Sequence, residues 1–209
     1  MLMRYNKIIN LNFKSMLKKI STVAAIAVSL IASNVSAQTF KADASKSSVE
    51  WLAKKVTGQH NGDVKLTSGS LVLEKGAVKS GAFEVDLTTI KVLDLTGEYA
   101  DKLVGHLKND DFFAVDKFPK ATLVITEGTK AANGTYDLKG NLTIKGITKP
   151  IAFPATITTV GNTVTATSAI TVDRTLYDIK YGSASFFDSL GDKAIDNNFL
   201  LTVKLVAKK

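Results

Sequence analysis

Acid–base or metal chemistry in this chain would have to begin from its two histidines, His60 and His106. The four-residue spacing of His106 and Asp110 would place both on one face of a helix, where they could form an acid–base pair or part of a metal site. A metal needs further ligands, which the sequence does not cluster there. We therefore expect no metal site, and we interpret His106 as a capping or core residue that is also a candidate ligand contact.

The other groups that could act in catalysis are poorly placed. Ser185 and Ser189 lack the strand, sharp turn and helix, with flanking glycines, that a nucleophilic serine needs. Asp110 and Asp111 are adjacent, so on a helix they face different directions and cannot act as paired carboxylates. There is no cysteine, which excludes a thiol nucleophile and disulfides. We expect no catalytic residue, no cofactor and no enzyme activity.

Arg174 is the only arginine after residue 37, and two roles are open for it. It could form a structural ion pair with Asp173 or Asp178. Alternatively, its planar guanidinium could meet the polar or anionic head of a ligand.

Most aromatic residues are expected in the core. Phe112 and Phe113, like Phe186 and Phe187, are adjacent pairs on turn-rich segments, so we expect them to line an entrance. The complete set of candidate ligand contacts is Trp51, His106, Phe112, Phe113, Tyr136, Phe153, Arg174, Tyr177 and Phe186.

The first 37 residues have the pattern of a signal peptide. Lys18 and Lys19 precede an apolar run at residues 23–31, and small residues at 35–37 fit a cleavage site. Met16 is a possible true start. A retained membrane anchor is the alternative, but the run is short for a bilayer span. We expect cleavage, no membrane span afterwards, and a periplasmic or secreted product.

Cleavage also changes the charge of the protein. Five of the 27 basic residues and none of the 19 acidic ones lie in the first 37 residues, so 22 basic residues remain and the net charge falls from +8 to +3. The remaining lysines are scattered, which argues against a nucleic-acid partner. Protein partners are not indicated by the sequence.

Alternating apolar residues predict an all-β fold. Strands are expected within residues 47–56, 64–73, 83–89, 121–127, 136–144, 151–157, 164–172 and 199–205. A helical face formed by Tyr99, Leu103, His106 and Leu107 predicts one short helix in mid-chain, ended before Pro119.

Several irregularities are also predicted. Residues 57–63 should form a loop, residues 68–70 a bend or bulge, and Gly140 an interruption. Asn133–Gly134 is a strong hairpin signal. Pro154 removes a ladder donor, which favours an edge or bulge position.

About eight antiparallel strands with one apolar face must close into a barrel or pack as a sandwich. The barrel is favoured, because an immunoglobulin-like sandwich would more often carry a buried disulfide. The small residues Ala53, Ala155, Ala166 and Ser168 fall in the inward phase of their strands and leave room for one slender ligand.

Three stretches carry a family resemblance: residues 105–122 (GHL, DFF and FPKAT), residues 140–150 (GNLTIKGITKP), and Asp173-Arg174 followed by Tyr177-Asp178-Ile179. In them the chain resembles the YceI-like family of exported, lipocalin-like barrels that bind polyisoprenoids and related amphiphilic lipids. The resemblance covers residues 39–207 and implies that residues 38–209 form a lipid-binding barrel without catalytic residues.

The sequence thus favours a lipocalin-like antiparallel β-barrel of about eight strands that carries an isoprenoid or other amphiphilic lipid. Two alternatives remain. One is an enzyme acting on such a lipid, which would need a polar site around His106 and Arg174. The other is an interaction barrel with a filled core.

Overall fold

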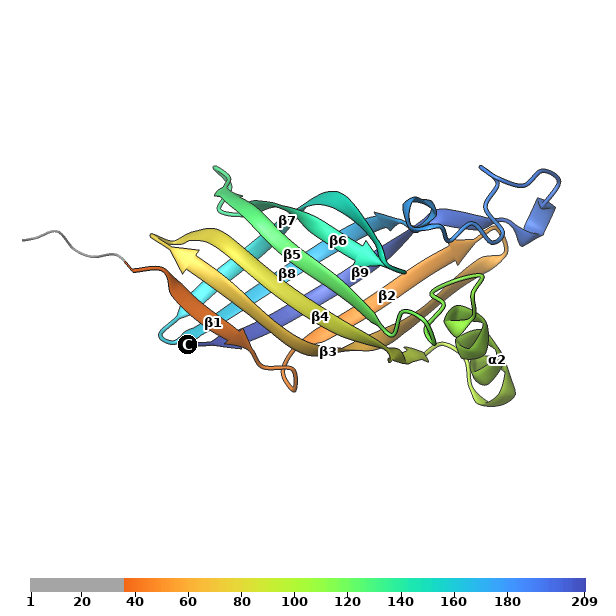
Figure 1. Cartoon of the computed structure of the whole chain (residues 1–209), viewed down its shortest axis with the longest axis horizontal. Coiled ribbons are helices and arrows are strands. Elements are labelled where there is room, and N and C mark those ends of the chain that lie inside the picture. The colour runs from red at the N-terminus through yellow and green to blue at the C-terminus, as the bar shows by residue number, and fades with distance from the viewer. Residues whose placement is uncertain (1–35) are drawn as a thin grey trace, which may run out of the picture. The chain divides into compact units, whose positions relative to one another are not determined.

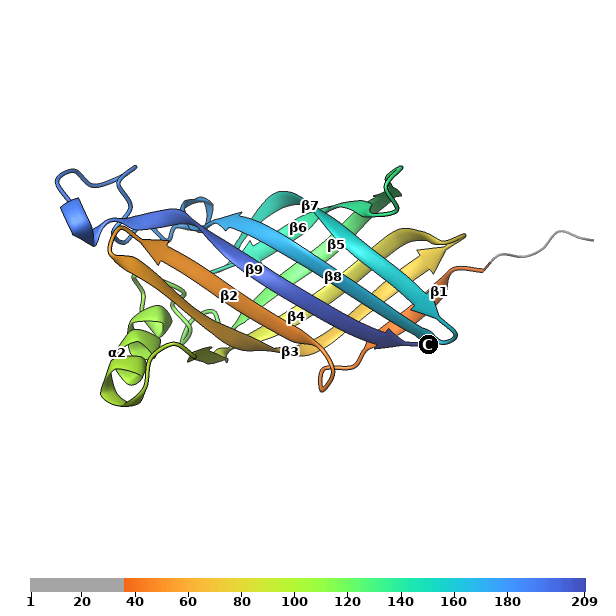
Figure 2. The same ribbon diagram turned by 180° about the vertical axis from the view of Figure 1, so that it is seen from behind.

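Alternating apolar residues fold the chain into a closed barrel of long antiparallel strands, shown in Figures 1 and 2. The structure is a computed structural model, and it describes residues 36–209. The strands are β1 (Gln38–Ala42), β2 (Ser48–Lys55), β3 (Gly58–Glu74), β4 (Ala77–Val92), β5 (Lys120–Lys130), β6 (Tyr136–Ile144), β7 (Ile147–Val160), β8 (Thr163–Asp173) and β9 (Ile195–Lys208). Helix α2 (Gly97–Lys108) and the short 3₁₀ helices η1 (Arg174–Tyr177) and η2 (Gly191–Lys193) complete the described elements.

The nine strands occupy eight positions around the barrel. The order is β1-β3-β2-β9-β8-β7-β6-β5-β4, and β3 pairs with β4 to close the ring. Both β1 and β2 lie between β3 and β9: β2 pairs with the first part of β3, and β1 pairs with its last residues. Within residues 36–209, the expectation of about eight strands and one mid-chain α-helix is therefore confirmed.

The two ends of the barrel differ, and we name them by what they carry. The helix end holds the β2–β3 and β6–β7 turns, α2 and residues 174–194, whereas the terminal end holds the β3–β4, β5–β6 and β7–β8 turns and the C-terminus (Figure 1). The terminal end has a solid core, in which Phe40, Val164 and Ala207 are each at most 1% exposed. Tyr136 closes this end further, because its hydroxyl donates to the Gly76 carbonyl at 2.6 Å.

Several of the predicted irregularities are present. The pairing of β3 with β4 shifts between Leu66 and Ser68, so the bulge lies just before the predicted residues 68–70, which themselves pair in register with β4. Turns at Lys75–Gly76 and Lys145–Gly146 have positive φ at both residues, as tight hairpin turns require. The segment after β8 is irregular, as expected.

Two local predictions were wrong. Residues 57–63 are not a loop, because β3 begins at Gly58 and His60 pairs with Ala53. β6 continues through Gly140, where a side chain would instead collide with the backbone of Val124 on β5. The predicted signal peptide lies almost wholly in residues 1–35, outside the described residues.

Candidate functional site

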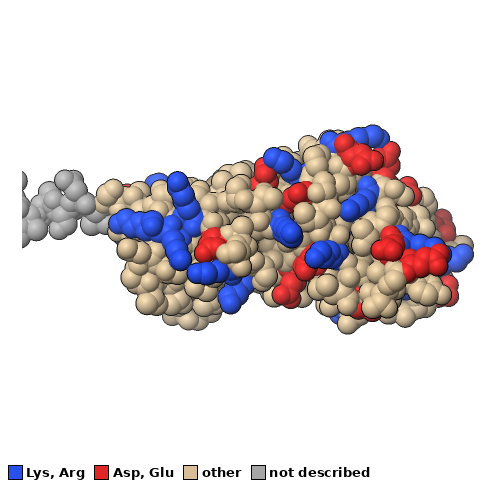
Figure 3. Space-filling model, turned by 90° about the horizontal axis from the view of Figure 1, so that it is seen from below, with Lys and Arg blue, Asp and Glu red and all other residues tan. Residues whose placement is uncertain are grey.

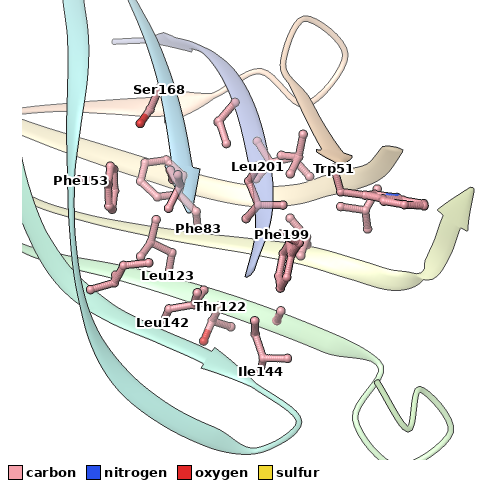
Figure 4. A pocket seen from close by; sticks show the side chains of 18 of the residues that line it. Trp51, Phe83, Thr122, Leu123, Leu142, Ile144, Phe153, Ser168, Phe199 and Leu201 are labelled. Atoms are coloured by element: carbon pink, nitrogen blue, oxygen red, sulfur yellow. The ribbon is translucent and has the colours of Figure 1, made fainter. Parts of the chain in front are cut away.

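The barrel encloses an apolar cavity of about 220 Å³. Every strand except β1 contributes to its wall, and Figure 4 shows side chains converging on the interior from several strands. The labelled residues of this wall are Trp51, Phe83, Thr122, Leu123, Leu142, Ile144, Phe153, Ser168, Phe199 and Leu201. Water-sized groups each need about 10–15 Å³ of such space, so the cavity holds on the order of 15–20 methylene-sized groups.

The inward-facing residues of β9 show that the middle of the barrel is hollow. Phe199, Leu201 and Val203 lie on the cavity wall, yet all three remain partly exposed. In a close-packed interior such residues would be fully buried. Their free surface faces the void.

Small residues create part of this space. Ala53, Ala155, Ala166 and Ser168, which the sequence placed in the inward phase, all line the cavity. Larger side chains at these positions would fill the interior, as in a solid barrel.

Trp51 is held in the wall by close packing. It pairs with Gly62 on β3, and a Cβ atom at Gly62 would collide with the indole. Within residues 36–209, the Trp51 Nε1 atom is the only buried side-chain nitrogen or oxygen without a hydrogen-bond partner. The cavity wall therefore contains one unsatisfied donor.

The helix end of the cavity is covered by α2 and the turns that follow it. Leu107, Phe112 and Phe113 line the cavity there. The chain turns back on the helix, since Phe113 N donates to the Leu107 carbonyl and Val115 N to the Lys108 carbonyl. Because residues 112 and 113 lie in turns and not in a strand, both rings reach the cavity.

His106 does not line the cavity. Its ring makes edge-on contacts with Phe112 and Tyr181, with centroids 4.9 and 4.6 Å apart. Its nearest carboxylate partner is Asp111, at 3.9 Å, and not Asp110. Asp110 instead accepts from Lys117 at 2.6 Å. The pair with His106 that the spacing allowed is not formed, because the helix ends at Lys108 and Asp110 is no longer one turn away.

Arg174 lines the cavity at the helix end and is 4% exposed. Its guanidinium donates to four backbone carbonyls at 2.8–3.0 Å, those of Ile179, Tyr181, Ile195 and Asp196. Five N–H groups are available, so these bonds leave one. Arg174 thus anchors the irregular segment to the start of β9.

One of the two roles left open for Arg174, an ion pair with Asp173 or Asp178, is not observed in the described part of the chain. Asp173 instead caps η1 by accepting from Thr175, and Asp178 pairs with Lys180. Burial lowers the pKa of Arg174, and the charges of Asp173 and Asp196 oppose that shift without touching the guanidinium. The site therefore holds a buried cation bonded to neutral carbonyls.

The structure brings together five of the nine candidate contacts. Those on the cavity wall are Trp51, Phe112, Phe113, Phe153 and Arg174.

The other four lie elsewhere. His106 belongs to the aromatic cluster above, and Tyr136 to the plug at the terminal end. Tyr177 is 2% exposed in η1, and its burial raises the pKa of the phenol. Phe186 is 49% exposed, with the Lys180 ammonium 5.2 Å from its ring centre. None of the four is on the cavity wall.

Phe83 and Phe199 are wall residues that sequence reasoning assigned to the core. Alternation is the same in a hollow and in a solid barrel, so the pattern carried no signal that separates these two roles.

No single charged patch dominates the face of the barrel drawn in Figure 3. Lysines and carboxylates are interspersed over the face in Figure 3. Among residues 36–209 no cluster of His, Cys, Asp or Glu could hold a metal ion. In the same residues no helix is long and apolar enough for a bilayer span.

Comparison with known proteins gives a family match over most of the chain. A family model described as a YceI-like domain matches residues 40–207. A UPF0312 protein of Yersinia enterocolitica is 46% identical over 57 residues, which are 27% of this chain and 29% of that protein. A UPF0312 protein of a Shewanella species is 35% identical over 79 residues, 38% of this chain and 40% of that protein. These matches thus span less than half of the relatives' length.

Solved structures share the fold. Burkholderia cenocepacia BcnA has a TM-score of 0.66 at 20% identity, over 80% of this chain and 99% of that one. A domain from Saccharophagus degradans, described as polyisoprenoid-binding, has a TM-score of 0.60 at 15% identity, over 81% and 97%. The Campylobacter jejuni YceI protein has a TM-score of 0.52 at 18% identity, over 86% and 88%.

Proposed function

This chain belongs to the YceI-like family, and from its cavity we propose that it binds and carries a long-chain isoprenoid or other amphiphilic lipid without chemistry of its own. The main support for this proposal is the packing of the side chains in the cavity wall. Its aliphatic and aromatic side chains surround a void instead of packing against one another. The solved domain described as polyisoprenoid-binding supports the choice of ligand class.

The energetics favour the tail as the source of affinity. Burial of one methylene contributes about 0.8 kcal/mol, so 15 groups give about 12 kcal/mol before the cost of association. One charge-assisted hydrogen bond adds roughly 1.5–3 kcal/mol. The head would therefore adjust selectivity more than affinity.

We place the head of the lipid at the helix end, near Arg174. Most of the wall is apolar, and Arg174 carries a buried charge there. Asp196 also lines the cavity, but Arg174 bonds its backbone carbonyl and not its carboxylate. A phosphate or carboxylate could take the remaining N–H group and offset the charge. The tail would then extend toward the plug at the terminal end.

The two alternative functions receive less support. An enzyme would need His106 and Arg174 on one polar face of the cavity, but His106 is packed among aromatic rings outside the wall. A filled-core interaction barrel would need inward residues such as Leu201 to be fully buried, and Leu201 is partly exposed.

We also propose that residues 1–37 direct export and are removed, so that the protein acts in the periplasm or outside the cell. Strand β1 begins at Gln38, so cleavage after Ala37 would leave every described strand intact. Intact-mass measurement of the exported protein should give a chain that begins at Gln38; a longer chain would contradict this cleavage.

The test of ligand binding is extraction of the purified mature protein with organic solvent, followed by mass spectrometry. We expect a long-chain lipid in the extract at near-stoichiometric amounts. The Ala166→Trp variant, which fills the cavity, should yield much less, and the outward Ala169→Trp variant should yield as much as the unmodified protein. Equal yields from both variants would contradict the proposal.

A further inference from the structure

The barrel wall is incomplete between β7 and β8. These strands have 14 and 11 residues, yet they pair only from Val160↔Thr163 to Thr156↔Thr167. Toward the helix end, residues 147–155 pair with β6 alone and residues 168–173 with β9 alone. Six residues of β8 at about 3.3 Å each give a slit about 20 Å long. Figure 2 shows the two ribbons diverging in this direction.

Two prolines explain why the strands separate. Pro150 and Pro154 lie within the unbroken ladder between β6 and β7, opposite Asn141 and Asp137. The two prolines are four residues apart in the strand, so their backbone nitrogens point to the same side of β7. That side faces away from β6 and toward β8. Proline has no N–H group, so this edge of β7 lacks two donors that a partner strand would need.

A side chain takes over where the ladder stops. Ser168 Oγ donates to the Pro154 carbonyl at 2.6 Å, at the start of the slit. At the other end η1 packs near β7. Figure 4 shows Phe153 and Ser168 beside each other on the two borders of the slit.

The slit borders the cavity directly. Ile151 and Phe153 on β7 and Ser168 and Ile170 on β8 all line the cavity. Arg174, where we place the head of the lipid, follows immediately after β8.

Passage through either end of the barrel would disturb more structure. The terminal end is plugged by Phe40, Val164 and Ala207, each at most 1% exposed. The helix end is covered by Leu107 and Phe112, held by the turns after α2. Opening the slit requires movement of side chains and loss of the Ser168–Pro154 bond, while the strand ladders stay intact.

We propose that the slit between β7 and β8 is a lateral portal, through which the lipid tail enters and leaves the cavity sideways with its head remaining near Arg174. This inference rests on the proposed function. It defines the route of the ligand, and therefore the part of the wall that controls exchange rates.

The absence of cysteine allows a direct test by cross-linking. Ala152→Cys/Thr171→Cys places two exposed thiols across the slit, at positions that would be opposite each other if the register continued. Thr158→Cys/Thr165→Cys is the matched control, since these residues are paired in the closed part of the same hairpin. Both variants are treated with a short bismaleimide, and mass spectrometry confirms the cross-link.

The probe is cis-parinaric acid, an amphiphilic fatty acid whose tetraene accepts excitation energy from Trp51, the only tryptophan. Stopped-flow mixing measures uptake, and transfer to phosphatidylcholine vesicles measures release. We expect the slit cross-link to slow both by at least about tenfold, with the control cross-link within about twofold of the unmodified protein. Unchanged rates with the slit cross-linked would overturn the portal.

A single substitution tests the portal without cross-linking. Ser168→Ala removes the bond across the slit and should make uptake and release about two- to tenfold faster. Thr143→Ala removes a comparable side-chain bond between the paired strands β6 and β7 and should leave the rates unchanged. Unaltered exchange in Ser168→Ala would also overturn the portal. No energy transfer in the unmodified protein would overturn the proposed function itself, and the portal with it.

Discussion

The indole of Trp51 packs directly against the backbone of Gly62, the residue opposite it on β3. A Cβ atom at Gly62 would lie 2.5 Å from Trp51 Cζ2 and would also overlap the Lys91 carbonyl. Both contacts involve groups that cannot turn away freely. The position of the tryptophan in the cavity wall therefore depends on a residue without a side chain.

Gly62→Ala should accordingly lower the free energy of unfolding by about 2 kcal/mol or more, because overpacking forces the indole or the strand to shift. Gly105→Ala is the control. It lies in α2, nothing lies within 4 Å of an added Cβ, and the change should stabilise by about 0.5–1 kcal/mol. Urea unfolding followed by circular dichroism measures both. A Gly62→Ala protein as stable as the original would contradict this packing.

Much of the fold was predictable because each strand buries one face and therefore alternates. The strands, the Asn133–Gly134 turn, the bulge near Ser68 and the helix before Pro119 all follow from local chemistry. The short strand β1 was not predicted, because only Phe40 marks its inward face. Its place depends on pairing with β3 and β9, which are distant from it in the sequence.

The loop predicted at residues 57–63 failed for a related reason. Its Gly, Asn and Asp residues favour turns, but here their backbone groups pair with β2 and continue β3. Pairing with a neighbouring strand outweighed local preference.

The site was predictable only in part. The small residues Ala53 and Ala166 correctly indicated space inside the barrel. The bonds of Arg174 could not be read from the sequence, since its partners are backbone carbonyls up to 22 residues away. Every residue has a backbone carbonyl group, so the residue types do not show which carbonyl groups Arg174 will bond.

Ala166→Trp should block lipid binding while the barrel stays folded. Ala166 lines the cavity between Ile157 and Leu205, and an indole there would occupy the space of the tail. We expect at least about tenfold weaker binding of cis-parinaric acid by isothermal titration calorimetry. Ala169→Trp, exposed on the same strand, should bind as the original does. Full affinity in Ala166→Trp would mean that the tail lies elsewhere.

Arg174→Ala should weaken binding of cis-parinaric acid by about tenfold, the loss of one charge-assisted hydrogen bond. Binding of its methyl ester, which has no charged head, should change by less than about twofold. Titration of both ligands separates the two roles of this residue. Equal losses would show that Arg174 acts only by anchoring the irregular segment through its carbonyl bonds.

Arg174→Lys gives a complementary result. Lysine keeps the charge but cannot reach four carbonyls with one planar fork. We expect the free energy of unfolding to fall in both variants, because each leaves buried carbonyls without a donor. Selectivity for the acid over its ester should persist in the lysine variant alone, and its loss there would argue against a charge-based head site.

Asp94 should make stability depend on acid pH, because it ties β3 to the segment that leads into α2. Asn61 N donates to its carboxylate at 3.0 Å, and His60 Nδ1 lies 2.8 Å from it. Burial by itself raises the pKa of Asp94. The hydrogen bonds with Asn61 and His60 lower the pKa by more than burial raises it, so the pKa lies below 3.8. The stabilisation is therefore fully present above pH 3.8 and is lost as the pH falls through the lowered pKa.

Asp94→Asn should be less stable than the original at pH 7, and urea unfolding curves of the two proteins should converge below pH 3.8. Asp101→Asn, exposed on α2, should stay within about 0.5 kcal/mol of the original at pH 7. A constant difference between Asp94→Asn and the original down to the acid limit would show that the carboxylate charge plays no part.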